Sequence, residues 1–289
     1  MNIVHQIRKE WKPRPSRSHK GDFGKVFILA GSEGLTGAAR LSAVGALRAG
    51  AGLVTLGVPR KVYSILARRE AEVMVRPFAS TRAGTLALRA FKPIFDFAKT
   101  QDVLAVGPGL SQHFETQELI RRLVSQTRHP LVLDADGLNA FKGHLEVLKY
   151  CRRRAILTPH PGEFVRLFGG RLSADDQGRK KRAREAAEKF GVFVVLKGNP
   201  TVVASPEGKI YLNRTGNPGM ATGGTGDVLT GILAALLGQK FSFWNAARFG
   251  VYLHGLAGDM AKRKTGEVSL VAGDILNALA DAIKRTVRH

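Results

Sequence analysis

Residues 217–227 combine glycine, threonine and one carboxylate in a pattern that suits phosphate chemistry. The segment reads NPGMATGGTGD and runs directly into the apolar residues 228–237. Small residues leave backbone N–H groups uncovered and a helix start presents further free N–H groups, so both favour an anion. Asp227 stands at the junction, where its carboxylate could take a proton from a hydroxyl while a phosphate rests on the amides. The segment therefore indicates phosphoryl chemistry.

Polar loops follow four short apolar runs, each at the point where a predicted strand ends. In an open α/β sheet, ligands bind in the crevice beyond the carboxyl ends of the strands. We therefore expect these loops to converge with the glycine-rich turn before Asp227. The loops are residues 107–110 after Val103–Val106, 134–139 after Leu131–Leu133, 158–164 after Ala155–Leu157, and 197–201 after 192–196.

Each of these residues also has a structural interpretation when it is taken alone. Asp134 and Asp136 could cap the following helix, or contact a ligand or magnesium. His160 lies in a stiff loop between two prolines, Lys197 could be an exposed charge instead of a phosphate contact, and Asp227 could simply stabilise its helix. Their joint placement at successive strand ends favours a binding site over these separate explanations.

Several well-known site patterns are absent from the sequence. The glycine-rich segment is not a P-loop, because GxxxxGK[ST] does not occur, and the turn at residues 31–37 lacks the GxGxxG dinucleotide fingerprint. No His, Cys and carboxylate cluster has zinc spacing, and no GxSxG elbow is present. Hydride transfer on a Rossmann fold is thus unsupported.

The pattern of the chain predicts an α/β fold. Continuous apolar strands at residues 26–30 and 53–58 and in the four runs above are separated by helical segments such as 38–49. Such strands indicate a mostly parallel central sheet with helices on both faces. The last third is expected to be helical, at residues 226–237, 243–262 and 271–285. We expect one domain over residues 21–289, preceded by an N-terminal arm over residues 1–20.

Composition limits the class of protein. The 289 residues are 44% hydrophobic and 7% aromatic, enough to bury a sizeable core. A single cysteine, Cys151, excludes an internal disulfide framework, and neither an apolar run of about 20 residues nor a signal-peptide pattern occurs. These features predict a cytoplasmic protein.

The formal net charge of +22 at pH 7 could attract nucleic acid or steer anionic substrates. The densest basic run, at residues 179–184, continues into a pattern that predicts an exposed amphipathic helix. Few aromatic residues lie between these charges, which disfavours a platform for single-stranded nucleic acid. Nucleic-acid binding is therefore a remote alternative.

Taken together, the motifs resemble the ADP- or ATP-dependent NAD(P)H-hydrate dehydratases of the ribokinase-like superfamily, whose fold is a three-layer α/β/α sandwich. The matching segments appear in family order between about residue 20 and residue 275. They are KVFILAGS at 25–32, residues 37–54, VGPGL at 106–110, LDADGLN at 133–139, LTPHPGEF at 157–164, LKG at 196–198 with Thr201, and residues 217–231.

The resemblance implies a repair reaction, in which the S epimer of hydrated NADH or NADPH is dehydrated at the expense of ADP or ATP with Mg²⁺. It implies that Asp227 is catalytic and contacts the hydrated cofactor together with Gly109 and His160. No ligand for the metal is assigned. The residues expected to contact the adenine nucleotide are Lys197, Gly198, Asn199, Pro200, Thr201, Gly223, Gly224, Thr225 and Gly226.

The resemblance also implies a homotetramer and a functional pairing with a separate NAD(P)H-hydrate epimerase, because few residues precede the first motif. We expect neither a membrane nor a specific nucleic acid as partner. The main alternative is a kinase of the same superfamily that acts on a vitamin-precursor alcohol, since the glycine-rich segment and Asp227 would serve both reactions. The loops at 107–110 and 158–164 favour the dehydratase.

Overall fold

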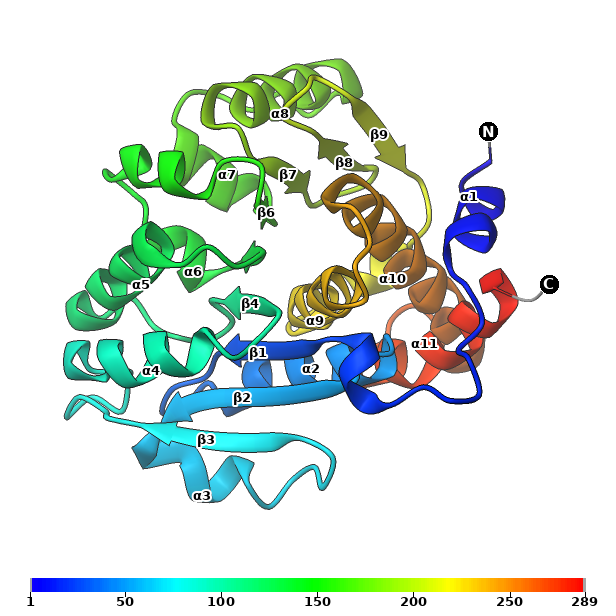
Figure 1. Ribbon diagram of the computed structural model, residues 1–289. Helices are drawn as coiled ribbons and strands as arrows, with labels where there is room; N and C mark the ends of the chain where they lie inside the picture. The colour runs from blue at the N-terminus through cyan, green and yellow to red at the C-terminus, as the bar shows by residue number, and fades with distance from the viewer. Residues whose placement is uncertain (1, 288–289) are drawn as a thin grey trace.

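The computed structural model describes residues 2–287; residues 1, 288 and 289, at the ends of the predicted arm and domain, lie outside this range. Within it, nine strands form one sheet in the order β3-β2-β1-β4-β5-β6-β7-β8-β9 (Figure 1). All pairs from β3 to β7 are parallel, and β8 and β9 are added antiparallel at one edge. The prediction of a mostly parallel sheet is confirmed.

The central strands coincide with the predicted apolar runs, because strands that are buried on both faces read as continuous apolar sequence. They are β1 (Lys25–Leu29), β2 (Leu53–Pro59), β4 (Val103–Val106), β5 (Leu131–Leu133), β6 (Ala155–Leu157) and β7 (Phe193–Leu196).

Three strands at the edges of the sheet escaped prediction. β3 (Met74–Phe78) contains an arginine and a proline and alternates in exposure, as an edge strand can. β8 (Thr201–Ala204) begins within the segment that the sequence analysis assigned to a loop, and β9 (Ile210–Asn213) is only partly buried. These strands lack the long apolar run that identified the others.

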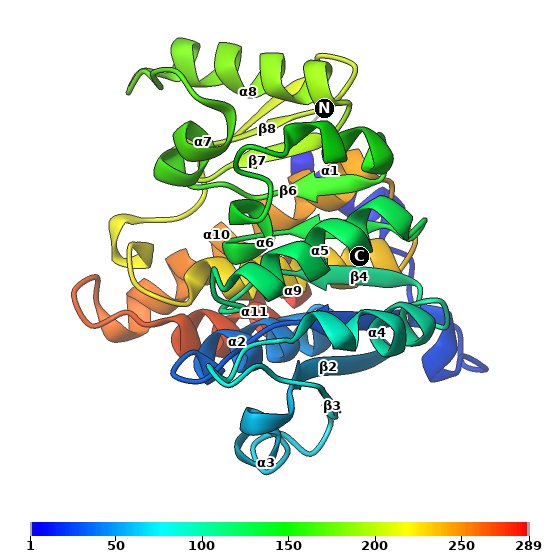
Figure 2. The same cartoon turned by 90° about the vertical axis from the view of Figure 1, so that its left-hand side faces the viewer.

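Helices cover both faces of the sheet, which confirms the three-layer α/β/α architecture (Figure 2). One face carries α2 (Thr36–Arg48), α9 (Thr225–Gly238), α10 (Phe243–Thr265) and α11 (Ala272–Val287). The other carries α4 (Phe91–Ala98), α5 (Phe114–Gln126), α7 (Pro161–Phe168) and α8 (Asp176–Phe190).

Shorter helical turns connect these elements. α3 (Tyr63–Leu66) and α6 (Asp136–Asn139) are single α-helical turns. The 3₁₀ segments are η1 (Lys20–Phe23), η2 (Arg60–Val62), η3 (Leu88–Ala90), η4 (Leu145–Cys151) and η5 (Pro218–Met220). Among the described residues, no helix is both long enough and apolar enough to cross a membrane.

The segment predicted to be an N-terminal arm contains the helix α1 (Ile3–Glu10). Asn2 caps its start by accepting a hydrogen bond from the Val4 amide at 2.9 Å. Ile7 is fully buried, and Arg8 donates to the Thr286 carbonyl of α11 at 2.9 Å. α1 is therefore packed against α11, while the boundary at residue 20 stays a prediction.

Glycines allow α2 and α9 to pack backbone against backbone. A Cβ atom on Gly231 of α9 would lie 2.1 Å from the Ser42 carbonyl oxygen, and one on Gly45 of α2 would lie 2.8 Å from the Val228 carbonyl oxygen. Every residue of α9 from Val228 to Gly238 is buried. This close approach holds α9 rigidly, with its N-terminus at the edge where the parallel strands end.

We predict that Gly231→Ala destabilises the protein by about 1–3 kcal/mol, because the added methyl group forces α2 and α9 apart. This loss outweighs the gain of roughly 1 kcal/mol that alanine brings to a helix. Gly273→Ala in α11 is the matched control, since nothing lies within 4 Å of the new Cβ. Urea denaturation measures both; a Gly231→Ala protein as stable as Gly273→Ala would contradict the packing argument.

Candidate active site

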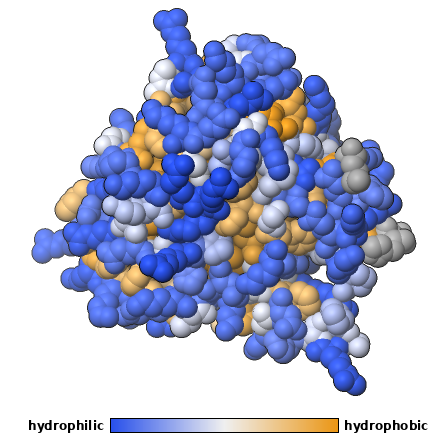
Figure 3. All heavy atoms as spheres, turned by 45° about the horizontal axis from the view of Figure 1, so that its top comes forward, coloured by the Kyte–Doolittle hydropathy of each residue, from blue (hydrophilic) through white to orange (hydrophobic). Residues whose placement is uncertain are grey.

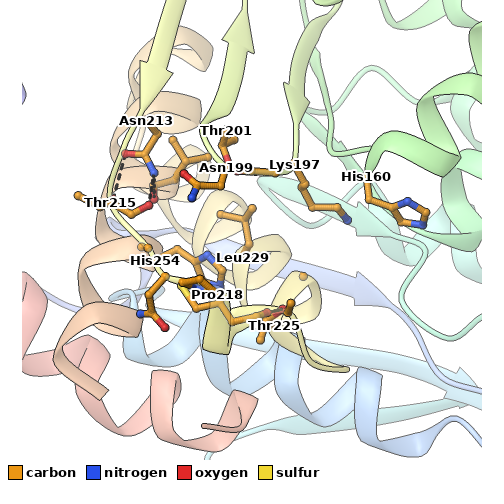
Figure 4. Close-up of a pocket in the computed structure, with 18 of the residues that line it drawn as sticks. His160, Lys197, Asn199, Thr201, Asn213, Thr215, Pro218, Thr225, Leu229 and His254 are labelled. Atoms are coloured by element: carbon orange, nitrogen blue, oxygen red, sulfur yellow. Dashed lines mark hydrogen bonds between the residues drawn. The ribbon is translucent and has the colours of Figure 1, made fainter. Parts of the chain in front are cut away.

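A cavity of about 710 Å³ lies beside the loop after β7 and the first turn of α9 (Figure 4). This volume is typical of a small-molecule site. Eight of the sequence-predicted residues line it, and four others, Gly109, Pro200, Gly224 and Asp227, do not. Those in the lining are His160, Lys197, Gly198, Asn199, Thr201, Gly223, Thr225 and Gly226.

The start of α9 offers free N–H groups to this cavity. Gly224 precedes the helix with φ +91°, a left-handed conformation that glycine adopts readily, and no side chain in the described part of the chain caps the helix. The Thr225 hydroxyl donates instead to the carbonyl oxygens of Met220 and Thr222, at 3.0 and 3.1 Å. The first N–H groups of this long helix are thus available to an anion.

Asp259 of α10, which no sequence motif singled out, anchors the glycine-rich segment. Its carboxylate accepts hydrogen bonds from the Gly216 amide and from the Asn217 side chain, both at 3.0 Å. The Asn217 oxygen in turn accepts from the Gly219 amide at 3.1 Å. These bonds fix the path of the chain into η5 and α9.

Lys197 is ion-paired and largely buried, so it is not the exposed charge that was considered as the alternative to a phosphate contact. Its side chain is 21% exposed, and its Nζ lies 2.7 Å from Asp134 Oδ1 and 3.7 Å from Glu163 Oε2. Burial opposes the charge, but these two carboxylates outweigh it and raise the pKa of Lys197. The ammonium group therefore persists at the cavity wall.

Asp134 does not cap a helix, so that interpretation was wrong. The residue before α6 is Ala135, and the Asp134 carboxylate accepts hydrogen bonds from Lys197, from the Thr158 hydroxyl at 2.7 Å and from the Thr230 hydroxyl at 2.8 Å. Asp134 is 1% exposed, so all of these bonds are sheltered from water. Asp134 thus connects the ends of β5, β6 and β7 with α9.

Asp136, two residues later, serves a different part of the site. It is the first residue of α6, and its carboxylate accepts hydrogen bonds from the Ser111 amide at 2.8 Å and from the Asn139 side chain at 3.0 Å. Ser111 has φ +74°, an unusual conformation for a residue with a side chain. Asp136 therefore braces the loop after β4.

Asp227 lies in the first turn of α9, facing the same cluster of charges. The pKa of its carboxyl is raised to about 7, chiefly by burial and also by the charges of Asp134 and Glu163, while Lys197 opposes this rise. A carboxyl with this pKa is half ionised near neutral pH. It can therefore accept a proton from a hydroxyl more readily than an ordinary aspartate.

His160 and Gly109 mark the ends of two neighbouring loops. His160 precedes α7, and its Nδ1 accepts a hydrogen bond from the Gly162 amide at 3.1 Å while about half of the side chain stays exposed. Gly109 has φ +65° and packs against Leu35 and Ala38 at the start of α2. Gly109 thus lies on the α2 side of the site.

Gly107, in the motif shared with Gly109, has a clear structural reason to be glycine. A Cβ atom at this position would lie 1.7 Å from the Asp134 carbonyl oxygen, and φ is +140°. The loop after β4 therefore runs directly against the loop after β5. The side chain of any other residue would separate Asp134 from its partners.

His254 of α10 lines the cavity and was missed by sequence reasoning. Burial lowers the pKa of its imidazole to about 4, so the ring is neutral at physiological pH; the Thr225 backbone opposes this shift, and Lys197 adds to it. Its Nε2 has no hydrogen-bond partner among the described residues. A lone histidine inside a helical pattern gives no signal of this placement.

Arg179 is an exception to the solvated face that was predicted for the basic run at the start of α8. It is 5% exposed and donates to the carbonyl oxygens of Pro200 at 2.7 Å and Lys197 at 3.2 Å. Other members of the run, including Lys181 and Arg184, are exposed as expected, and hydrophilic atoms cover much of the surface drawn in Figure 3. Arg179 turned inward because the β7–β8 turn presents carbonyl groups that need donors.

Comparisons with known proteins agree with the kind of site that the geometry indicates. A family model described as NAD(P)H-hydrate dehydratase matches residues 26–281. A bifunctional NAD(P)H-hydrate repair enzyme of Moorella thermoacetica is 45% identical over 94% of this chain and 51% of its own length. An ADP-dependent (S)-NAD(P)H-hydrate dehydratase of Neisseria meningitidis serogroup B is 37% identical over 93% of this chain and 88% of its own length.

A solved structure is similar over nearly the whole chain. It is that of an ADP/ATP-dependent NAD(P)H-hydrate dehydratase from Bacillus subtilis, co-crystallised with ATP and Mg²⁺. The TM-score is 0.82 at 31% identity, over 98% of this chain and 97% of that one. The chain spans about half the length of the bifunctional relatives that it matches.

We predict that Asp227→Asn stabilises the fold at alkaline pH. A carboxyl whose folded pKa is about 7, against 3.8 for the free residue, lowers the stability of the folded state as pH rises through this window. The amide removes this cost, which is roughly 2–4 kcal/mol at full ionisation. Urea denaturation at about pH 5 and about pH 8 measures it, and the advantage of the variant should be larger at the higher pH.

Asp281→Asn is the control for this experiment, because Asp281 is exposed on α11. Surface substitutions of this kind change stability by less than about 0.5 kcal/mol. An Asp227→Asn protein that is no more stable than wild type at either pH would show that ionisation of the Asp227 carboxyl does not destabilise the fold.

Proposed function

The chain belongs to the NAD(P)H-hydrate dehydratase family, and we propose that it dehydrates the S epimer of hydrated NADH and NADPH at the expense of ADP or ATP. One observation carries the proposal. The uncapped start of α9 and the Lys197 ammonium group line one end of a cavity of about 710 Å³, and the Asp227 carboxyl, with a pKa of about 7, lies in the same first turn of α9. That set suits transfer of a phosphoryl group to a hydroxyl.

The chemistry explains why a dehydratase needs such a site. Hydroxide is a poor leaving group, so the ring hydroxyl of the hydrated nicotinamide is first phosphorylated. Phosphate then departs as the electron pair of the ring nitrogen forms a C=N double bond, and loss of a proton from the adjacent ring carbon converts this iminium into the new C=C double bond and restores the nitrogen electron pair. Asp227 takes the hydroxyl proton as the oxygen attacks phosphorus, and the amides of α9 and Lys197 stabilise the charge on the phosphoryl oxygens. The net reaction is that of a hydro-lyase.

We assign the nucleotide to the cavity and the hydrated cofactor to the neighbouring loops. Gly109 and His160 would contact the hydrated cofactor beside Asp227, from the loops after β4 and β6. The nucleotide would be held by Lys197, Gly198, Asn199, Pro200 and Thr201 in the β7–β8 turn and by Gly223, Gly224, Thr225 and Gly226 at the start of α9.

Mg²⁺ would enter this site with the nucleotide. Among the described residues, no group of three or more His, Cys, Asp or Glu side chains gathers to hold a metal ion. Mg²⁺ in nucleotide sites is held largely by phosphate oxygens and water. Its contribution would be to neutralise charge on the phosphates, and the protein's part is to orient the phosphates against α9.

Other features of the resemblance remain part of this proposal. They are a functional pairing with an NAD(P)H-hydrate epimerase, which would convert the R epimer into the substrate, a homotetrameric assembly and a cytoplasmic location. The bifunctional names of several relatives support the pairing.

We predict that the purified chain restores the near-ultraviolet absorbance of reduced nicotinamide from hydrated NADH, in a reaction that requires ADP or ATP and Mg²⁺. Asp227→Asn should lower kcat by about 10²–10⁴-fold, the usual contribution of a general base. Consumption of nucleotide only with a thiazole or pyrimidine alcohol would contradict the dehydratase and establish the kinase instead.

We also predict that kcat/KM of the wild-type protein rises with pH through about 7. Asp227 must be ionised to accept a proton, and its pKa is about 7, so activity falls as the carboxyl is protonated below that pH. A pH–rate profile measures this dependence. A kcat/KM that stays flat from acid to alkaline pH would show that Asp227 does not act as the base.

A further inference from the structure

Asp134 belongs to none of the nucleotide or cofactor contacts predicted above, yet it is the most enclosed charge of the site. It is 1% exposed, and both of its oxygens are occupied. Oδ1 accepts from Lys197 and Thr158, each at 2.7 Å, and Oδ2 accepts from Thr230 at 2.8 Å. A buried carboxylate with this many donors is fixed in position.

The partner that Asp134 holds lies directly below the start of α9. A Cβ atom on Gly226 would lie 3.3 Å from Lys197 Nζ and 3.9 Å from Asp134 Oδ2. Glycine at this position therefore leaves the space that the ammonium group needs. Thr230, one turn further along α9, ties the same carboxylate to the helix. The lysine is thus held against the helix end that offers its N–H groups to an anion.

Lys197 has other carboxylates within reach if Asp134 is lost. Glu163 Oε2 lies 3.7 Å from its Nζ, and Asp227 also attracts it. Long lysine side chains pivot easily, because four rotatable bonds carry the charge. Without Asp134, the ammonium group would move toward these two carboxylates and away from its place below Gly226.

We propose that Asp134 is a positioning residue of the dehydratase reaction, which holds the Lys197 ammonium group under the first turn of α9 and keeps it from neutralising Asp227. The inference rests on the proposed function. It assigns Asp134 a role through Lys197 and not through contact with a substrate.

The charges around Asp227 support this role. The groups that face Asp227 are Asp134 at the end of β5, Lys197 at the end of β7 and Glu163 in α7. Asp134 and Glu163 raise the pKa of Asp227 and Lys197 lowers it. Removal of the Asp134 charge therefore acts on the pKa of Asp227 in two ways. A negative charge that raises this pKa disappears, and the freed ammonium group, which lowers it, moves closer. The pKa of Asp227 must then fall.

The test is Asp134→Asn in the full-length protein. We expect the nucleotide KM to rise and kcat to fall by about tenfold to a hundredfold together, as for loss of a hydrogen bond to a charged group. The acidic limb of the kcat/KM profile should move to lower pH by about one unit. A purely structural role for Asp134 would lower activity at every pH and leave the limb in place, and that result would overturn the proposal.

Asp136→Asn is the matched control, because it neutralises a carboxylate of the same loop whose partners are Ser111 and Asn139. Its acidic limb should coincide with that of wild type. A limb displaced as far as in Asp134→Asn would mean that disturbance of the loop, and not the Asp134 charge, moves the titration.

Asp134→Glu keeps the proposal testable if Asp134→Asn does not fold. This variant retains the carboxylate but displaces the lysine by the length of one methylene group. The acidic limb of the pH profile should therefore stay in place and the nucleotide KM should rise. An unchanged KM would contradict the proposal. Titration of the Asp227 carboxyl by ¹³C NMR, with Asp227→Asn to assign the signal, gives the same answer without turnover. An inactive wild-type protein would refute the proposed function. If the wild type is active but Asp134→Asn shifts neither the acidic limb of the pH profile nor the titration of Asp227, this inference alone is refuted.

Discussion

The Asp134 carboxylate, buried at the carboxyl edge of the sheet, constrains the arrangement of everything around it. A carboxylate buried away from water needs hydrogen-bond donors or a counter-charge, and loss of one partner of a buried pair costs about 3–5 kcal/mol. Here the partners come from three separate elements: Thr158 after β6, Lys197 after β7 and Thr230 inside α9. The loops therefore meet at one point because one charge requires donors from all of them.

This arrangement also explains why the anion-binding helix end lies where it does. Gly45 and Gly231 allow α2 and α9 to touch, and Asp259 of α10 fixes the chain that enters α9. The helix cannot slide along the sheet, so its free N–H groups and Lys197 stay together. A preorganised set of donors of this kind stabilises developing charge without first having to reorganise. The pKa of Asp227 is raised because this base is buried beside the carboxylates of the same cluster.

Much of the fold and part of the site could be predicted from the sequence. Strands such as Val103–Val106 and Ala155–Leu157 are buried on both faces, so their composition alone identifies them. The edge strand β3 could not be found, because one exposed side lets it carry Arg76 and Pro77. Arg179 and His254 were also beyond reach, since a charged or lone polar residue shows no sign of what it will face.

The sequence by itself determined the class of fold, the loops that end on one edge of the sheet, and the chemistry available there, because periodicity, glycine content and side-chain type are local properties. Only the tertiary structure decided how those side chains are used. It paired Lys197 with Asp134, gave Asp136 to the Ser111 loop, and raised the pKa of Asp227 to about 7. Those outcomes depend on distance and burial between residues far apart in the chain, and the order of residues along it does not contain them.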